Sequence, residues 1–420
     1  MPADSPGLTA PTFLLIAICA VVYFLDGLIH SILGPLAPEI ARSLHLGNAE
    51  LGPIFSANLA GQCLGLIVLP LFAGRAGQRA VVLVSLVGFG LAQSGTALSN
   101  GPASLFFWRL ITGVFLGGCL PSCLALVTAA APGKRRGLAI MMLFTGYGLG
   151  ATVAGLVATG FTDRGGWRMA TIAVGAVCIV AAVVAWAWLK EPPASDIAQK
   201  KPNALLIFSP RYLLGTLMLW LLFICMLTIS YCLNSWLPVL LVEVGRDDRL
   251  AALSVSIFSL GGIVAALGVG LLIDRLGAMR TLVSFLTLST ILLFVIGQLL
   301  ASASTAVLLV LLAVCGFFVL GAYGGVNVVL ASFYPASLRA AGIGWTKSVG
   351  RIGTLVAPVL IGAGLSAGMA DTTIMSMFAV PALLAVVSLI VIALCEARAD
   401  ESRGPAARSR NAAGYRVSGS

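Results

Sequence analysis

Long apolar stretches separated by short polar segments recur along the whole chain. A helix needs about 20 apolar residues to cross the hydrocarbon core of a bilayer. The pattern therefore predicts an all-α polytopic membrane protein with 12 transmembrane helices. We expect these spans at residues 13–35, 51–73, 80–98, 104–129, 137–160, 168–189, 212–241, 250–272, 281–301, 304–332, 340–366 and 373–395.

A longer polar segment divides the 12 predicted spans into two sets of six. Residues 190–211 are rich in Pro, Lys and Ser, whereas the other connections are short, so we interpret this segment as a cytoplasmic linker. The interpretation gives an N-terminal six-helix bundle at 1–189 and a C-terminal six-helix bundle at 212–396. The last stretch, 397–420, is rich in Ala, Arg and Ser and is expected to be a disordered cytoplasmic tail.

The two halves contain similar short motifs at similar positions. Arg75-Ala-Gly77-Gln-Arg79 follows the second span, and Arg275-Leu-Gly277-Ala-Met-Arg280 follows the eighth, an offset of 200 residues. Such parallel repeats are typical of transporters, which bind their substrates near the bilayer midplane between the two halves.

Small residues recur at helical spacing within several predicted spans. Glycines let two helix backbones approach closely, which is how many membrane helices pack. We expect close helix contacts at Gly61, Gly65, Gly113, Gly117, Gly146, Gly148, Gly150, Gly350 and Gly353.

Composition supports the membrane interpretation and argues against a metal or a disulfide framework. The 420 residues are 59% hydrophobic and only 10% charged, which is far from the composition of a soluble domain. The nine cysteines are an odd number, lie in apolar stretches and form no zinc-binding spacing. We therefore expect no metal, no cofactor and no disulfide.

The distribution of the basic residues explains the net charge of +10. Alternate loops carry 17 Lys and Arg residues on one side and 5 on the other. The positive-inside rule then places both termini in the cytoplasm. The basic excess reflects membrane topology, so we expect no nucleic-acid partner and a multi-pass location in the cell inner membrane.

Asp26 is the only acidic residue deep within a predicted span. A carboxylate at this depth is costly and usually serves a purpose such as proton transfer. His30 follows one helical turn later on the same face, so two groups that can change charge lie on one helix wall. We expect proton coupling through Asp26 and His30.

Three basic residues also lie inside predicted spans: Arg109 in the fourth, and Lys347 and Arg351 on one face of the eleventh. Three cations against one acid leave positive charge that a low-dielectric interior tolerates poorly. A bound anion would balance it. We therefore predict an anionic substrate, although Arg109 and Arg351 could also serve in structural ion pairs, and Lys347 could extend to the membrane surface.

Aromatic and amide side chains occupy the same predicted helices. This mixture suits a flat ring that carries a carboxylate, because rings stack, amides bond ring substituents and a guanidinium binds the carboxylate. Each of these side chains could instead serve helix packing or the membrane interface. The candidates are Tyr147, Tyr231, Asn234, Tyr323, Asn327 and Trp345, and Asn58 and Gln62 form a further polar pair.

Enzyme motifs are absent from the sequence. We find no HExxH, GxSxG or Walker A pattern, so catalysis is not expected. Export of a drug or metabolite by proton antiport remains an alternative, although the fifth span lacks a Gly-Pro pair. A transporter-like sensor that binds an acid without moving it is a second alternative.

Several motifs resemble the major facilitator superfamily and, within it, the aromatic acid:H+ symporter family; the resemblance covers residues 12–395. It rests on Asp26-Gly27 with Pro35-Leu-Ala-Pro38, Leu51-Gly-Pro-Ile-Phe-Ser-Ala-Asn-Leu-Ala-Gly61, Arg109-Leu-Ile-Thr-Gly113, Gly166-Trp167-Arg168, Asn234-Ser-Trp236-Leu-Pro238 and Tyr334-Pro335-Ala-Ser-Leu-Arg339 leading to Gly350-Arg351-Ile-Gly353. The resemblance implies proton-coupled uptake of a small aromatic carboxylate by alternating access. Protons, this anion and the lipid bilayer would be the partners of a monomer.

The resemblance also implies roles for charged residues at the cytoplasmic ends of the helices. Gating residues would be Arg75, Arg79, Asp274, Arg275 and Arg339.

The sequence departs from the family pattern at four positions. Ile29 stands where the family has a second Asp, Pro70 and Gly74 replace a Gly and an Asp of the first gating loop, and Ala129 replaces an acid. An electrostatic latch in the N-terminal half is therefore expected to be lost.

Overall fold

The structure is a computed structural model that describes residues 10–131, 135–161, 165–191 and 204–401. Within these residues it is helical and contains no strand. The elements in order are α1 (Ala10–Leu44), α2 (Asn48–Ala76), α3 (Gln78–Gly95), η1 (Thr96–Leu98), α4 (Pro102–Ala130), α5 (Arg136–Phe161), α6 (Gly166–Trp188), η3 (Ala204–Phe208), α7 (Pro210–Glu243), α8 (Asp248–Leu276), α9 (Ala278–Leu299), α10 (Thr305–Phe333), α11 (Ala336–Ser366), α12 (Asp371–Met377) and α13 (Ala379–Glu401).

Twelve stretches of the described chain are long and apolar enough to cross a membrane, which confirms the predicted number of spans. The last span is built from two elements, α12 and α13, which meet at Phe378. α1 is longer than its apolar core because the helix continues through Pro35 and Pro38 to Leu44. Prolines are tolerated inside such helices where neighbouring helices pack around them.

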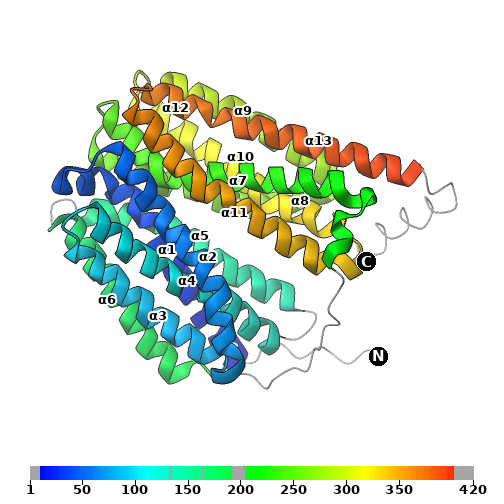
Figure 1. Cartoon of the computed structure of the whole chain (residues 1–420), viewed down its shortest axis with the longest axis horizontal. Coiled ribbons are helices and arrows are strands. Elements are labelled where there is room, and N and C mark those ends of the chain that lie inside the picture. The colour runs from blue at the N-terminus through cyan, green and yellow to red at the C-terminus, as the bar shows by residue number, and fades with distance from the viewer. Residues whose placement is uncertain (1–9, 132–134, 162–164, 192–203, 402–420) are drawn as a thin grey trace.

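The helices form two groups, α1–α6 and α7–α13, which lie side by side (Figure 1). Glycines allow close contacts inside each group. A Cβ at Gly61 of α2 would overlap the backbone of Leu110 in α4, and one at Gly261 of α8 would overlap that of Ala313 in α10. The same contact therefore occurs in both halves at equivalent positions.

The two groups meet through α1, α2 and α5 on one side and α7, α8 and α11 on the other. Small residues again allow these contacts: Gly34 lies against the backbone of Asn234, Gly52 against Pro358, and Gly155 against Ala252. All these contacts lie at the end of the molecule where the α1–α2 and α7–α8 turns are found. We call this end of the molecule the closed end.

The boundaries of the two predicted bundles and of the linker remain predictions. Most of the expected linker at 190–211 lies outside the described residues, and η3 forms its described C-terminal part. At the other end α13 continues to Glu401, four residues past the expected start of the tail, and residues 402–420 lie outside the description.

Gly150 tests the importance of the close contact between α1 and α5. A Cβ at this position would overlap the carbonyl oxygen of Phe24 in α1. We expect Gly150→Ala to lower the free energy of unfolding by about 1–3 kcal/mol, the usual cost of forcing extra atoms into a packed core. Thermal unfolding of the purified protein in detergent measures the effect.

Gly160→Ala is the matched control on the same helix, because a Cβ there has no atom within 4 Å. This control is expected to keep the melting temperature of the wild type. Equal melting temperatures for both variants would show that the α1–α5 contact is not as tight as described.

Candidate functional site

Asp26 lies in the middle of α1, where helices surround the residue on all sides. Its side chain is 4% exposed, and Oδ1 is buried without a hydrogen-bond partner among the described residues. The only salt bridge in the described part of the chain joins Arg42 and Asp248, so Asp26 has no ion-pair contact. A buried carboxylate without a partner is costly when charged, which favours a proton or a cation at this position.

His30 lies one turn from Asp26 and joins three other helices. Its Nδ1 lies 3.3 Å from Nδ2 of Asn58 and 3.5 Å from Nε2 of Gln62, both in α2. The imidazole also lies edge-on to Tyr231 of α7, with ring centroids 4.7 Å apart, and 6.2 Å from the ring of Tyr147 in α5. The structure thus brings together His30, Tyr147 and Tyr231, which are three of the site candidates named from the sequence.

Arg351 of α11 reaches this cluster from the opposite bundle. Its Nη1 donates a hydrogen bond to Oε1 of Gln62 at 3.3 Å. The Cys63 thiol of α2 also lies within hydrogen-bonding reach of the guanidinium, which forms no ion pair with the described residues, so several of its N–H donors remain for a ligand. Arg351 is also the cation within electrostatic reach of Asp26, although the two are not in contact.

Two further candidates on α10 and α7 lie near Arg351 or Tyr231. Tyr323 is within electrostatic reach of both of these residues. Asn234 lies one turn after Tyr231; its Nδ2 donates to the carbonyl of Ser230 at 2.8 Å, while its Oδ1 is buried without a partner among the described residues. A ligand hydroxyl would satisfy such an acceptor.

Asn327 and Lys347 make no such connection to the cluster. The Asn327 amide donates to the carbonyl of Tyr323 at 2.9 Å in its own helix. Lys347 is exposed one turn before Arg351, and its ammonium has no partner among the described residues. Both side chains lie on helices that line the cluster, and only Lys347 offers free donors to an anion.

Arg109 does not join Arg351. It is 1% exposed inside the N-terminal group of helices, where Nη2 donates to Oε1 of Gln93 and to Oγ1 of Thr96, both at 2.6 Å. These two bonds tie α4 to the end of α3 and to η1. The geometry indicates a structural bond for Arg109 in place of the substrate contact expected from the sequence.

Trp345 also points away from the cluster. Its ring is stacked on Trp220 of α7 at a centroid distance of 6.1 Å and lies edge-on to Phe208 of η3 at 5.8 Å. The side chain is 43% exposed. Trp345 and Arg351 are six residues apart in a helix, a separation that places them on different faces, so the aromatic cluster is separate from the guanidinium.

The predicted gating residues form no ion pairs within the described part of the chain. Asp274, Arg275 and Arg339 are exposed, and the side chain of Arg75 lies outside the description. Arg79 donates from Nη2 to the carbonyl of Trp186 at 2.6 Å.

Glu191, shortly after α6, caps the start of α3 next to the predicted gating residue Arg79. Its Oε1 accepts from the backbone of Gln78 at 2.6 Å, and its Oε2 from that of Arg79 at 3.3 Å. Sequence reasoning missed this acid, because it is more than a hundred residues from the loop. The acids expected at Gly74 and Ala129 are absent, but a carboxylate still caps the start of α3.

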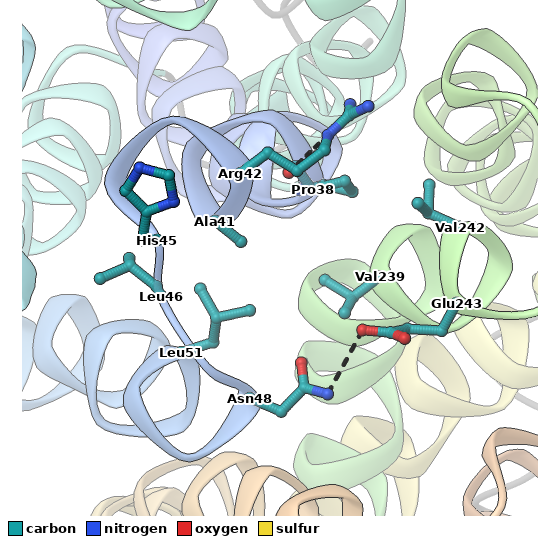
Figure 2. A pocket seen from close by; sticks show the side chains of 10 residues that line it. All are labelled: Pro38, Ala41, Arg42, His45, Leu46, Asn48, Leu51, Val239, Val242 and Glu243. Atoms are coloured by element: carbon teal, nitrogen blue, oxygen red, sulfur yellow. Dashed lines mark hydrogen bonds between the residues drawn. The ribbon is translucent and has the colours of Figure 1, made fainter.

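Polar bonds hold the two bundles together at the closed end. A cavity of about 360 Å³ lies there between α1, α2 and α7 (Figure 2). At its edge Asn48 donates from Nδ2 to Oε1 of Glu243 at 3.3 Å. Deeper in the interface, Ser56 donates to the carbonyl of Leu355 at 2.7 Å. The cavity is therefore part of the contact between the bundles, far along α1 from Asp26.

No group of three His, Cys, Asp or Glu side chains among the described residues is placed to hold a metal ion. The arrangement around Arg351 is instead that of a polar site between two helix bundles, with donors on α11, acceptors on α1 and α7, and aromatic rings on α5, α7 and α10. Such a site can bind an anion and exchange a proton. Transporters built from two helix bundles bind their substrates at such a position.

Comparison with known proteins assigns the class. The chain matches the Major Facilitator Superfamily over residues 19–358 and, in a second alignment, 219–416. It belongs to this superfamily, whose members are transporters and not enzymes, so the predicted superfamily and the absence of catalysis are confirmed.

Three curated relatives transport aromatic acids. The gallate transporter of Pseudomonas putida is 29% identical over 92% of this chain and 93% of its own length. The 4-hydroxybenzoate transporter of Acinetobacter baylyi is 28% identical over 93% of both chains. The 3-(3-hydroxy-phenyl)propionate transporter of Escherichia coli is 31% identical over 90% of this chain and 93% of its own. The resemblance to aromatic acid transporters is thereby confirmed, and this chain is a divergent member of the group.

Solved structures agree on the fold. The D-xylose-proton symporter superposes with a TM-score of 0.76 at 14% identity and covers 90% of this chain and 97% of its own. A bacterial homologue of the human lysosomal transporter Spinster, in an inward-facing and occupied conformation, gives a TM-score of 0.71 at 18% identity over 94% and 98%. The chain is a multi-pass membrane protein with the major facilitator fold.

Proposed function

We propose that this protein is a proton-coupled symporter that takes up a small aromatic carboxylate across the cell inner membrane by alternating access. Two observations together carry the proposal. A guanidinium with donors left for a ligand, Arg351, lies on one bundle, and a buried carboxylate whose Oδ1 has no hydrogen bond among the described residues, Asp26, lies on the other. The curated relatives support the aromatic substrate, because their names specify gallate, 4-hydroxybenzoate and a hydroxyphenylpropionate.

In this proposal Arg351 binds the substrate carboxylate, because a planar guanidinium can bind both carboxylate oxygens. Tyr147, Tyr231 and Tyr323 surround the ring, and the amide of Asn234 accepts from a ring hydroxyl. Lys347 attracts the anion towards the site, and Asn327, one turn after Tyr323 on α10, is kept as a further substrate-binding candidate. We assign Arg109 and Trp345 to the scaffold.

Asp26 is the proton carrier, with His30 as a second group that can change charge. A proton on Asp26 removes the cost of a buried negative charge. The site that holds both the proton and the substrate can then change conformation without a charge on Asp26. One proton with a monoanion is electroneutral. A difference of one pH unit then supplies about 1.4 kcal/mol, or roughly tenfold accumulation.

The hydrogen bonds at the closed end support an inward-facing state, because the positive-inside rule places both termini in the cytoplasm and the closed end on the outer side. Alternating access then requires the bonds of Asn48 and Ser56 to break as the outer side opens. We assign to gating five residues at the cytoplasmic ends of their helices, away from the closed end: Arg75, Arg79, Asp274, Arg275 and Arg339. We expect the working unit to be a monomer.

Asp26→Asn tests the proton carrier. We expect the variant to lose accumulation of 4-hydroxybenzoate driven by a pH gradient, because an amide cannot take up a proton at this position. Exchange of labelled for unlabelled substrate should continue, since Arg351 is intact. Uptake into proteoliposomes with and without a pH gradient gives both rates. Accumulation at the wild-type level would contradict the role of Asp26.

Arg351→Ala tests the anion site. A hydrogen-bonded charge contact contributes about 1.5–3 kcal/mol, so the affinity for aromatic acids should fall roughly tenfold to a hundredfold. Arg351→Lys keeps the charge but loses the planar fork, and should lie between the wild type and the alanine variant. Counterflow in proteoliposomes measures the apparent affinity. Unchanged affinity in Arg351→Ala, or binding without counterflow in the wild type, would refute an anion transporter of this design.

A further inference from the structure

The amide of Gln62 lies between the proposed proton group and the proposed substrate group. Gln62 is 7% exposed in α2, where it bonds His30 of α1 on one side and Arg351 of α11 on the other. The bond to His30 stays within the N-terminal bundle and the bond to Arg351 crosses to the C-terminal bundle, so Gln62 links the two groups across the contact. We propose that Gln62 is a positioning residue that makes the proton state of His30 depend on whether Arg351 holds substrate; this inference rests on the proposed function.

The direction of the two bonds follows from the chemistry of arginine. A guanidinium has donors and no acceptor, so the Gln62 oxygen must face Arg351. The Gln62 nitrogen then faces Nδ1 of His30 and donates to it. Nδ1 must therefore be an acceptor, which makes His30 neutral with its hydrogen on Nε2 while Arg351 is bound to Gln62.

Asn58 supports the same state of His30. Its Nδ2 lies 3.3 Å from the same Nδ1, and the Gln62 nitrogen lies 3.5 Å away. Nδ1 has one lone pair, and both distances are long for a hydrogen bond, as expected for two donors that share one acceptor. Two amides therefore stabilise an unprotonated Nδ1.

No carboxylate contacts the imidazole to oppose this arrangement. The titratable and charged groups that face His30 are Asp26 on its own helix, Arg109 of α4, Tyr147 of α5, Tyr231 of α7 and Arg351 of α11. None of them forms an ion pair with His30, since the described residues contain a single salt bridge elsewhere. The amides are thus the direct hydrogen-bond partners of Nδ1.

Substrate binding changes the partner of Arg351. A carboxylate held by the guanidinium takes over its donors, and Nη1 no longer fixes the Gln62 oxygen. The Gln62 amide can then rotate and present this oxygen to His30, while the Asn58 amide, whose Oδ1 has no partner among the described residues, turns its nitrogen away from Nδ1. A proton taken from water onto Nδ1 now finds an acceptor, so the imidazolium is stabilised only when substrate is present. By reciprocity, protonation of His30 strengthens substrate binding.

The chain offers a direct readout, because it contains only two histidines. His45 lies on the exposed turn after α1, so His45→Gln leaves His30 as the sole histidine. Nitrogen NMR of the full-length variant, labelled with 15N-histidine in lipid nanodiscs, distinguishes the two neutral tautomers and the imidazolium. Without substrate we expect Nδ1 to be unprotonated and Nε2 to carry the hydrogen.

Addition of 4-hydroxybenzoate at a fixed, mildly acidic pH should increase the imidazolium fraction of His30. An unliganded protein with hydrogen on Nδ1, or bound substrate without any change in the His30 signals, would overturn the inference.

Two substitutions of Gln62 should change the His30 signals in different ways. Gln62→Met keeps the size but has no hydrogen bonds to give, so the substrate-linked change of His30 should vanish. Gln62→Glu accepts from both neighbours and cannot donate, so it should favour the imidazolium even without substrate. Indistinguishable His30 spectra for these two variants would overturn the proposed bond directions.

Transport by the Gln62→Met variant separates coupling from binding. We expect accumulation driven by a pH gradient to fall about tenfold, as expected for the loss of one charge-assisted hydrogen bond, while counterflow continues. Ser56→Ala is the matched control, because Ser56 lies on the same helix and also bonds across to α11, through the Leu355 carbonyl at 2.7 Å. It should keep the substrate-linked change of His30.

If Ser56→Ala and Gln62→Met lost this change equally, a general loosening of the bundle contact would explain the effect, and the inference would fail. Failure of the proposed function gives a different result: no aromatic acid would bind to the wild type or undergo counterflow. In that case the unliganded tautomer and the response to Gln62→Glu still decide the orientation of the Gln62 amide.

Discussion

A buried carboxylate without a partner is the constraint on which the rest of this structure depends. Asp26 lies in the middle of a long helix, 4% exposed, with one oxygen lacking any hydrogen bond to the described residues. A charge in this position is costly in a low-dielectric interior. The cost of this charge is lowered by a proton from water or by the positive charge of Arg351 across the bundle contact. The binding of an anion to Arg351 changes both the charge that Asp26 experiences and its tendency to take up a proton.

The fold holds these groups at a distance that allows such a change. Arg351 is linked to the N-terminal bundle through the neutral amide of Gln62, and it makes no salt bridge with Asp26. A direct ion pair would have neutralised both charges and left neither available for a ligand. Contacts such as that between Ser56 and Leu355 join the bundles on the side of the closed end. The site can therefore stay polar while the helices pack closely around it.

Much of this arrangement was predictable from the sequence. Apolar length gave the 12 spans, because a bilayer imposes the same requirement on every helix. The scarcity of charge inside those spans made Asp26 and Arg351 conspicuous, and the helical period placed His30 on the face of Asp26. These inferences depend on local sequence and on the physics of the membrane.

The partners of the side chains were harder to predict, because they depend on tertiary packing. Arg109 was expected near the substrate, but it bonds Gln93 and Thr96 inside its own bundle. Trp345 is close to Arg351 in sequence but stacks on Trp220 on another face of α11. Glu191 caps a loop more than a hundred residues away. No local pattern reports such pairings, although the i, i+4 amides Asn58 and Gln62 were a visible signal for the bridge to His30.

Proton uptake on substrate binding is the most direct measure of the central claim that one site holds both an anion and a proton. Calorimetric titration of the wild-type protein with 4-hydroxybenzoate, in two buffers of different ionisation enthalpy at the same mildly acidic pH, yields the number of protons taken up. The account predicts a net uptake of at least one proton per bound acid. Binding heats that are the same in both buffers would mean that no proton accompanies the anion, and would contradict it.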